Sequence, residues 1–183
     1  MMPELSLNIL DLAQNSVVAE ADLITITVKA DTAADTLLIS IKDNGRGMSE
    51  ETVKRVSDPF YTTRTTRNVG LGIPFFKMAA ELTGGSMSIE SRLGVGTTTS
   101  AIFGLSHIDR MPLGDLAGTI TTLIGPNDQI DFVLEYGVDD TCFTMDTREF
   151  RQVLGDVRLS EPEVLDFIGN YVRENMENCG LTI

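Results

Sequence analysis

Asp43 and the two glycines that follow it are the residues of this chain best suited to bind a small ligand. Residues 37–42 alternate apolar and polar side chains, which is typical of a strand with one buried face. The strand ends in a carboxylate, and Gly45 and Gly47 leave bare backbone beside it for a flat ligand. Such a carboxylate suits an exocyclic amine, for example adenine N6, through a charge-assisted hydrogen bond. By itself, the stretch is more typical of a strand that ends in an Asn-Gly turn.

A second group of polar side chains lies in a helix predicted from Leu5 to Ala19. Asn8, Asp11 and Asn15 follow at i, i+3 and i+7, which puts them on one stripe of this helix, while Ser16 falls on its apolar face. If the stripe is buried, its groups need partners, because an unpaired buried polar group is costly. Magnesium and nucleotide phosphates would be such partners. For the helix by itself, a stripe that faces solvent is the more typical arrangement.

A third candidate is the start of the helix predicted from Ile73 to Leu82. A Gly-Leu-Gly sequence opens this helix and follows a loop rich in threonine and arginine. Glycines at a helix start expose N–H groups and the positive end of the helix dipole, which together form an anion site. Arg64 and Arg67 of the loop can add positive charge there. A single Gly-x-Gly carries little weight alone, but here it is the third element of a series.

The elements that would position these residues form a helix packed on an antiparallel or mixed sheet. Residues 23–30 and 36–42 alternate as paired strands, residues 86–92 and 97–103 as two more, and Ser49 caps a short helix over residues 50–56. Beyond residue 105 the sequence predicts a helix, a β-hairpin and two further helices. Their predicted ranges are 113–124, 130–145, 147–154 and 161–178, the last two opened by capping boxes at Asp146 and Ser160.

Composition excludes several classes of protein. The 183 residues can bury one sizeable core, and no apolar run approaches the roughly 20 residues that span a bilayer. No signal segment begins the chain, so we expect no membrane association. Cys142 and Cys179 stand apart without nearby histidines, which indicates neither a disulfide framework nor a zinc site and fits the cytoplasm. The net charge of −13 argues against nucleic-acid binding.

The charge is distributed unevenly and predicts two domains. Residues 1–105 contain 9 basic and 12 acidic side chains, whereas residues 106–183 contain 5 basic and 15 acidic side chains. We therefore expect a ligand-binding domain over 1–105 and a small acidic α/β appendage over 106–183, which docks on the first domain or on a partner.

Five motifs occur in order with suitable gaps. They are Asp11-x-x-x-Asn15, residues 43–47 (DNGRG), residues 58–64 (DPFYTTR), residues 70–72 (GLG) and residues 94–97 (GVGT). Together they resemble the N, G1, F, G2 and G3 boxes of the GHKL ATPases, which include histidine kinases, gyrase-type topoisomerases, mismatch-repair ATPases and heat-shock chaperones. The sequences PFYTTR and GLGI most resemble the catalytic domain of sensor histidine kinases. The resemblance covers about residues 5–104.

This resemblance implies an α+β fold of the Bergerat type, an α/β sandwich with helices on one face of a mixed sheet, and it implies ATP and Mg²⁺ as ligands. By position, Asn15 would bind Mg²⁺, Asp43 would bind the adenine amine, and Thr97 would support the adenine slot through water. The remaining residues of the implied site are Gly45, Gly47 and Met48 around the adenine, Phe60 as anchor of a lid, and Arg64, Arg67, Gly70, Leu71 and Gly72 at the phosphates.

The implied activity is that of a signalling kinase or kinase subunit that acts on a protein partner. Asp11 stands where hydrolysing members have a glutamate general base and many histidine kinases have an asparagine. It is one methylene shorter than glutamate, which leaves its role as a base open; Arg64 is the other candidate catalytic residue. The alternatives are a non-catalytic module switched by ATP and a plain ATPase. A homodimer is left open.

The chain also departs from the resemblance. Only four residues precede Leu5, so we expect neither the helical-hairpin phosphoacceptor domain of histidine kinases nor the strands that usually precede the N box. Residues 106–113 (SHIDRMPL) resemble the phosphoacceptor box of those kinases, with His107 as the only histidine of the chain. However, the acidic residue is displaced by one position and no second long helix follows. The alternative is that His107 simply ends the last strand.

Overall fold

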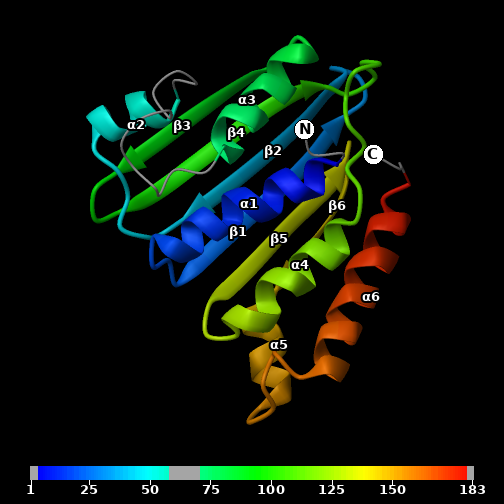
Figure 1. The fold of residues 1–183 in the computed structure, drawn as a ribbon. Coiled ribbons are helices and arrows are strands. Elements are labelled where there is room, and N and C mark those ends of the chain that lie inside the picture. Colours follow the sequence, from blue (N-terminus) through cyan, green and yellow to red (C-terminus); the bar gives the residue numbers. More distant parts are fainter. Residues whose placement is uncertain (1–3, 58–70, 181–183) are drawn as a thin grey trace.

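A six-stranded mixed sheet is the centre of the fold (Figure 1). The computed structural model describes residues 4–57 and 71–180. The strands are β1 (Leu23–Asp31), β2 (Thr36–Asp43), β3 (Ser86–Arg92), β4 (Gly96–Gly104), β5 (Asp131–Val138) and β6 (Thr141–Asp146). Their order across the sheet is β3-β4-β2-β1-β5-β6. Neighbouring strands are antiparallel except β1 and β5, which run parallel.

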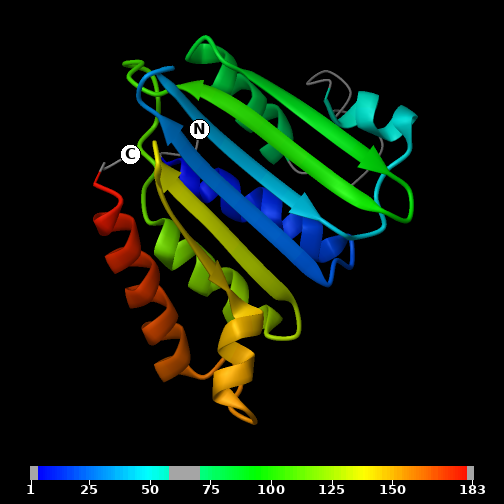
Figure 2. The same cartoon turned by 180° about the vertical axis from the view of Figure 1, so that it is seen from behind.

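Helices cover one face of this sheet. The helices of the described residues are α1 (Leu5–Val18), α2 (Glu50–Val56), α3 (Gly72–Leu82), α4 (Leu116–Ile124), α5 (Thr147–Leu154) and α6 (Pro162–Asn178), with a short 3-10 turn at Gly125–Asn127. In Figure 1, α3, α1, α4 and α6 lie side by side in that order. Among the described residues, no helix crosses the opposite face of the sheet (Figure 2). The predicted α+β sandwich with helices on one face is thus confirmed.

Local sequence patterns explain most element boundaries. Strands β1 and β2 alternate buried side chains with partly or fully exposed ones, as their apolar period predicts. The Ser49 hydroxyl accepts a hydrogen bond from the N–H of Thr52 at 3.2 Å, so the predicted cap of α2 is confirmed. Asp115 caps α4 in the same way, which is why that helix begins three residues later than predicted.

One of the two predicted capping boxes is wrong. Asp146 caps α5 as expected, through a hydrogen bond from the N–H of Arg148. For α6, however, the N-cap residue is Glu161, and Pro162 begins the helix. The hydroxyl of Ser160 instead donates to the Asp128 carboxylate at 2.7 Å. A long-range partner has therefore replaced the local one.

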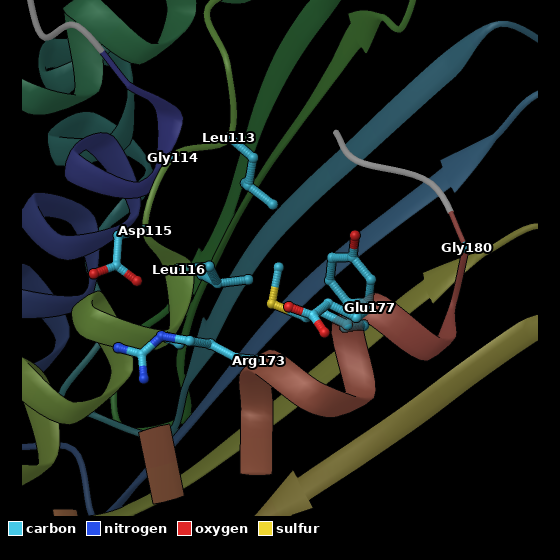
Figure 3. Close-up of a pocket in the computed structure, with 10 residues that line it drawn as sticks. Leu113, Gly114, Asp115, Leu116, Arg173, Glu177 and Gly180 are labelled. Atoms are coloured by element: carbon cyan, nitrogen blue, oxygen red, sulfur yellow. The ribbon is translucent and has the colours of Figure 1, made fainter. Parts of the chain in front are cut away.

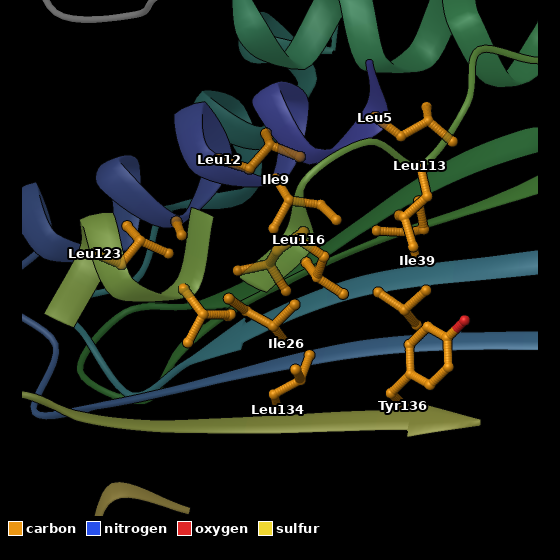
Figure 4. Packing of buried hydrophobic residues seen from close by; sticks show 14 of the residues in the cluster. Leu5, Ile9, Leu12, Ile26, Ile39, Leu113, Leu116, Leu123, Leu134 and Tyr136 are labelled. Atoms are coloured by element: carbon orange, nitrogen blue, oxygen red, sulfur yellow. The ribbon is translucent and has the colours of Figure 1, made fainter. Parts of the chain in front are cut away.

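The hydrophobic core lies between the sheet and the helices (Figure 4). Leu5 and Ile9 of α1 meet Ile26 and Ile39 of the sheet, and Leu134 of β5 continues the same layer. All five of these side chains are fully buried. The core is therefore built jointly by the N-terminal and C-terminal parts of the chain.

The C-terminal elements predicted for residues 106–183 are all present and extend the same sheet. Strand β5 pairs with β1 from Leu23 opposite Asp131 to Ala30 opposite Val138. The backbone N–H groups of the first two residues of α1 donate to the carbonyls of Pro112 and Leu113. The division into two domains at residue 105 remains a prediction. Within the described residues, no helix is long and apolar enough to cross a membrane.

Candidate functional site

A cavity of about 570 Å³ opens where the C-terminal half of α1 meets the ends of β2 and β4. This volume is in the range of small-molecule sites in proteins. Its walls combine apolar and polar side chains, and they include Asn15, Ser16, Ile41, Asp43, Gly47, Met48, Thr52, Ile73, Thr97 and Thr99. Five residues predicted from the sequence, Asn15, Asp43, Gly47, Met48 and Thr97, therefore come together in one cavity.

Asp43 is the most tightly held polar group of this cavity. Its side chain is 9% exposed, and Oδ1 accepts hydrogen bonds from the N–H groups of Gly45 at 2.9 Å and Thr97 at 3.3 Å. Oδ2 accepts a hydrogen bond from the hydroxyl of Ser16 at 2.6 Å. A carboxylate oxygen can accept more than one hydrogen bond, so Oδ2 keeps capacity for a ligand. The carboxylate is thus oriented before any ligand binds.

The glycines close the backbone around Asp43. Gly47 has a φ of +68°, and a Cβ there would lie 2.0 Å from the Arg92 carbonyl oxygen. Gly96 has a φ of +136°, and a Cβ there would lie 2.0 Å from the Asp43 carbonyl oxygen. Side chains are therefore excluded by neighbouring backbone. Gly45 orients the Asp43 carboxylate through its N–H group and is not part of the cavity wall.

Sequence reasoning missed two hydroxyl groups. Ser16 lies on the buried face of α1 and binds Asp43. Ser91 accepts a hydrogen bond from the N–H of Met48 at 2.8 Å and shares another with the Thr97 hydroxyl at 2.8 Å. A hydroxyl on the apolar face of the predicted helix was the available signal for Ser16, because it requires a polar partner. Ser91 lies in a strand whose pattern gave no such signal.

The polar stripe of α1 continues from this cavity to the start of α3. Asn15 has an exposed side chain in the cavity wall. The Asp11 carboxylate lies against Gly72, the first residue of α3, since a Cβ on Gly72 would be 1.8 Å from its Oδ2 atom. Asn8 is 1% exposed, and its Oδ1 has no hydrogen-bond partner in the described part of the chain. A buried acceptor without a partner is costly, and a bound water molecule would satisfy it.

Several predicted residues lie outside the described ranges. They are Phe60, Arg64, Arg67 and Gly70, together with the predicted lid. Leu71 and Gly72 are described and lie at the start of α3. The residue of this helix that lines the cavity is Ile73, and not Leu71 or Gly72.

The described residues contain no cluster of three or more His, Cys, Asp or Glu side chains that could hold a metal ion. Magnesium does not require such a cluster, because it often binds through one or two protein oxygens, substrate phosphates and water. The exposed amide of Asn15 in the cavity wall fits this mode of binding.

His107 lies away from this cavity, in a turn after β4. Thr97 lies near the cavity end of β4 and Gly104 at its other end, so at about 3.3 Å per residue His107 is on the order of 25 Å from Thr97. The N–H of Asp109 donates to Nδ1 of His107 at 3.2 Å. The phosphoacceptor role of His107 stays a prediction, and this geometry disfavours it.

A second cavity, of about 330 Å³, lies between the start of α4 and the end of α6 (Figure 3). Leu113, Leu116 and Tyr136 contribute to its wall. Burial raises the pKa of Tyr136 to about 12, so its phenol is neutral at physiological pH. The Asp115 carboxylate accepts a hydrogen bond from the N–H of Gly118 as the cap of α4. None of the site residues predicted from the sequence lines this second cavity, whereas five of them line the cavity at Asp43, which is therefore the candidate functional site.

All residues that line this cavity lie within the part of the chain that matches known proteins. Residues 3–107 match the family model described as histidine kinase-, DNA gyrase B- and HSP90-like ATPase. A putative sensor protein of Shewanella frigidimarina is 39% identical over 85 residues, which are 46% of this chain and 13% of that protein. Sporulation kinase E of Bacillus subtilis is 43% identical over 74 residues, which are 40% of this chain and 10% of that protein. The matched segments thus span only a small part of these relatives.

A solved structure shows the same fold. The MutL ATPase domain of Aquifex aeolicus, complexed with ADP, matches with a TM-score of 0.50 and 16% sequence identity. The match covers 74% of this chain and 61% of that one. At this identity the likeness concerns the fold, and it extends beyond the residues that the family model matches.

Proposed function

The chain belongs to the histidine kinase-, DNA gyrase B- and HSP90-like ATPase family, and we propose that it binds Mg-ATP in the Asp43 cavity and acts as a signalling kinase or kinase subunit on a protein partner. The observation that carries the proposal is the buried Asp43 carboxylate, which three donors hold in the cavity wall. The matched relatives named as a sensor protein and a sporulation kinase favour a signalling role.

The adenine ring would lie between Ile41 and Met48, with its N6 amine donating to Oδ2 of Asp43. Because the carboxylate is already oriented by Ser16, Gly45 and Thr97, binding requires little reorganisation of the protein. Guanine presents a carbonyl at the position of the adenine amine. A carbonyl and a carboxylate are both acceptors, so the site should select ATP over GTP.

The phosphates would lie toward the start of α3, where helix N–H groups and the positive end of the dipole favour anions. Asn15 is the residue we assign to hold Mg²⁺, which when bound would neutralise phosphate charge. Arg64 and Arg67, outside the described ranges, remain our predicted cations for the phosphates. We also propose a cytoplasmic location, which suits two cysteines with no predicted disulfide.

A plain ATPase is the second candidate function, and the position of Asp11 favours it. The carboxylate of Asp11 touches the first residue of α3, at the place proposed for the phosphates. From there it could take a proton from an attacking water molecule, as a general base does. If a hydroxyl or imidazole of a partner protein took the place of that water, the same arrangement of residues would support phosphoryl transfer to the partner.

Nucleotide binding is tested by the thermal stability of the protein with ATP, ADP and GTP, each with and without Mg²⁺. We expect ATP and ADP to raise the melting temperature and GTP to have little effect. Asn15→Ala should remove the Mg²⁺ dependence of ATP stabilisation while leaving much of the ADP effect. Equal stabilisation by GTP would contradict the role of Asp43.

Catalysis is tested with ATP labelled on the γ-phosphate. Transfer of label to a protein supports the kinase, and steady release of phosphate supports the ATPase. If neither transfer nor release occurs, the result supports an ATP-gated module. His107→Gln is the control for self-labelling. We expect no acid-labile label on the chain itself; a label that His107→Gln removes would show that His107 is a phosphoacceptor after all.

A further inference from the structure

An apolar groove lies between α5 and α6, away from the nucleotide cavity. It has a volume of about 310 Å³ and is lined by Phe150, Val153, Leu154, Glu163, Val164 and Phe167. The side chains of Val153 and Phe167 are 88% and 60% exposed, although both are large and apolar. Neighbouring exposed apolar side chains of this kind mark interaction sites more often than isolated ones do.

Aromatic packing holds the groove open. The ring centroid of Phe150 lies 6.1 Å from that of Phe167 and 5.7 Å from that of Tyr171, and both pairs are edge-to-face. Helix α5 lies at the end of the sheet beside the start of α6, so the sheet does not cover the groove (Figures 1 and 2). Contacts within the chain therefore hold the aromatic side chains of the groove wall in place.

The charge around the groove is negative. Three nearby arginines are neutralised within the chain, in the ion pairs Arg148–Asp146 at 2.7 Å, Arg151–Asp131 at 2.9 Å and Arg158–Asp128 at 2.7 Å. The fourth, Arg173 of α6, lines the cavity between α4 and α6 and not this groove. Glu163 in the groove wall and Glu174, two helical turns after Phe167 on α6, are exposed. Neither glutamate forms an ion pair within residues 4–57 and 71–180. Glu163 and Glu174, which we call the acidic rim, thus place unpaired negative charge on α6 at the groove wall and beyond it.

We infer that this groove binds an amphipathic helix of a protein partner, with apolar side chains on one face and lysines or arginines beside them. Helix-in-groove binding places residues at i, i+3, i+4 and i+7 against an apolar centre. The acidic rim would pair with the basic side chains and steer their approach. A second copy of this chain is a poor occupant because each copy carries a net charge of −13. Anionic membranes and nucleic acids are disfavoured for the same reason.

The experiment uses the full chain and a synthetic, fluorescein-labelled helical peptide as the probe. The peptide carries leucines at i, i+3, i+4 and i+7 and lysines at its other positions. Two matched peptides serve as comparisons: one replaces the lysines by glutamates, and one has the same composition in scrambled order. Binding is measured by fluorescence anisotropy without nucleotide, so its result does not depend on the proposed ATP site.

The informative variant is Val153→Ser with Phe167→Ser, since both side chains are exposed and their loss should leave the fold intact. The matched control is Ile108→Ser, because Ile108 is 93% exposed and lies in another part of the chain. We expect the double variant to weaken binding of the lysine peptide by roughly tenfold or more, as for central interface residues. The control should bind as the wild-type chain does. Glu163→Gln with Glu174→Gln should weaken binding less, and mainly at low salt.

Four outcomes would overturn the inference. The first is that the lysine peptide does not bind, and the second is that it binds the double variant as well as the wild-type chain. The third is that the glutamate or scrambled peptide binds with equal affinity, and the fourth is that the groove has a different occupant. A different occupant would appear as a dimer in sedimentation, or as binding to phosphatidylserine vesicles, that the double variant abolishes.

Discussion

The nucleotide cavity and the α5–α6 groove belong to one scaffold but are specified in different ways. At Asp43, one hydroxyl and two backbone N–H groups hold a single carboxylate, and close backbone contacts at Gly47 and Gly96 leave no room for a side chain. At the groove, exposed apolar side chains and an acidic rim provide a general chemical character. The first region has the properties of a site for one defined ligand, and the second those of a surface for a class of partners.

The largest expected effect comes from separating the two regions. A chain that ends at residue 105 would lose β5, which covers the edge of β1, and α4, which packs beside α1. Ile26 and Val28 would lose part of their cover, so we expect no cooperative thermal unfolding and no ATP binding by this fragment. Circular dichroism and calorimetry measure both properties.

A substitution in β5 tests the same dependence of the two regions with the chain kept at full length. Leu134→Ala removes a fully buried side chain from β5 and should cost about 2–5 kcal/mol of unfolding free energy. If the fragment ending at residue 105 unfolded cooperatively and bound ATP, the predicted domain boundary would stand, and the two regions would be energetically independent.

Asp11→Asn tests catalysis within the nucleotide region. If Asp11 is the general base for ATP hydrolysis, its loss should lower the rate of phosphate release by about 10²–10⁴-fold. Asp156→Asn is a matched control, because Asp156 is exposed and lies in none of the cavities described above. Hydrolysis that persists in Asp11→Asn would show that Asp11 has a structural or metal-binding role and would favour the kinase.

Asp43→Ala tests ligand recognition. A hydrogen bond to a charged group contributes about 1.5–3 kcal/mol, so ATP affinity should fall roughly ten- to a hundredfold. Isothermal titration with ATP gives this number, and Asp156→Ala serves as the control. An ATP affinity that stays unchanged in a folded Asp43→Ala protein would remove the basis of the adenine assignment.

The smallest effect concerns acid stability in the C-terminal region. Hydrogen bonds from Arg148 lower the pKa of the Asp146 carboxyl below its usual value. Stability from this group is therefore present above the unfolded-state pKa and is lost as the pH falls through the lower, folded-state pKa. Asp146→Asn keeps a capping acceptor but removes the charge. The wild-type chain should be slightly more stable at neutral pH, and urea titrations should show this difference vanishing in acid.

The sequence predicted features that depend on neighbouring residues and missed those that depend on distant ones. The alternation of apolar and polar side chains located β1 and β2, and the position of Asp43 directly after the second run placed it at a strand end. Both features are local properties of the sequence. The hydrogen bond from Ser16 to Asp43 spans 27 residues, and no local pattern encodes its partner. Ser160 shows the same limit, since Asp128 satisfies the hydroxyl that its local sequence assigned to a helix cap.

The parallel pairing of β1 with β5 also determines when the sheet can be completed during synthesis. Thr27 of β1 and Glu135 of β5, whose side chains form a hydrogen bond, are 108 residues apart. At about 5–20 residues per second, the ribosome needs on the order of 5–20 s to make that interval. During this time one edge of β1 is unpaired and the hydrophobic core is incomplete. The unpaired edge is a template for pairing with other nascent chains. The yield of folded protein should therefore depend more on the concentration of nascent chains and on chaperone binding to them than on the stability of the finished fold.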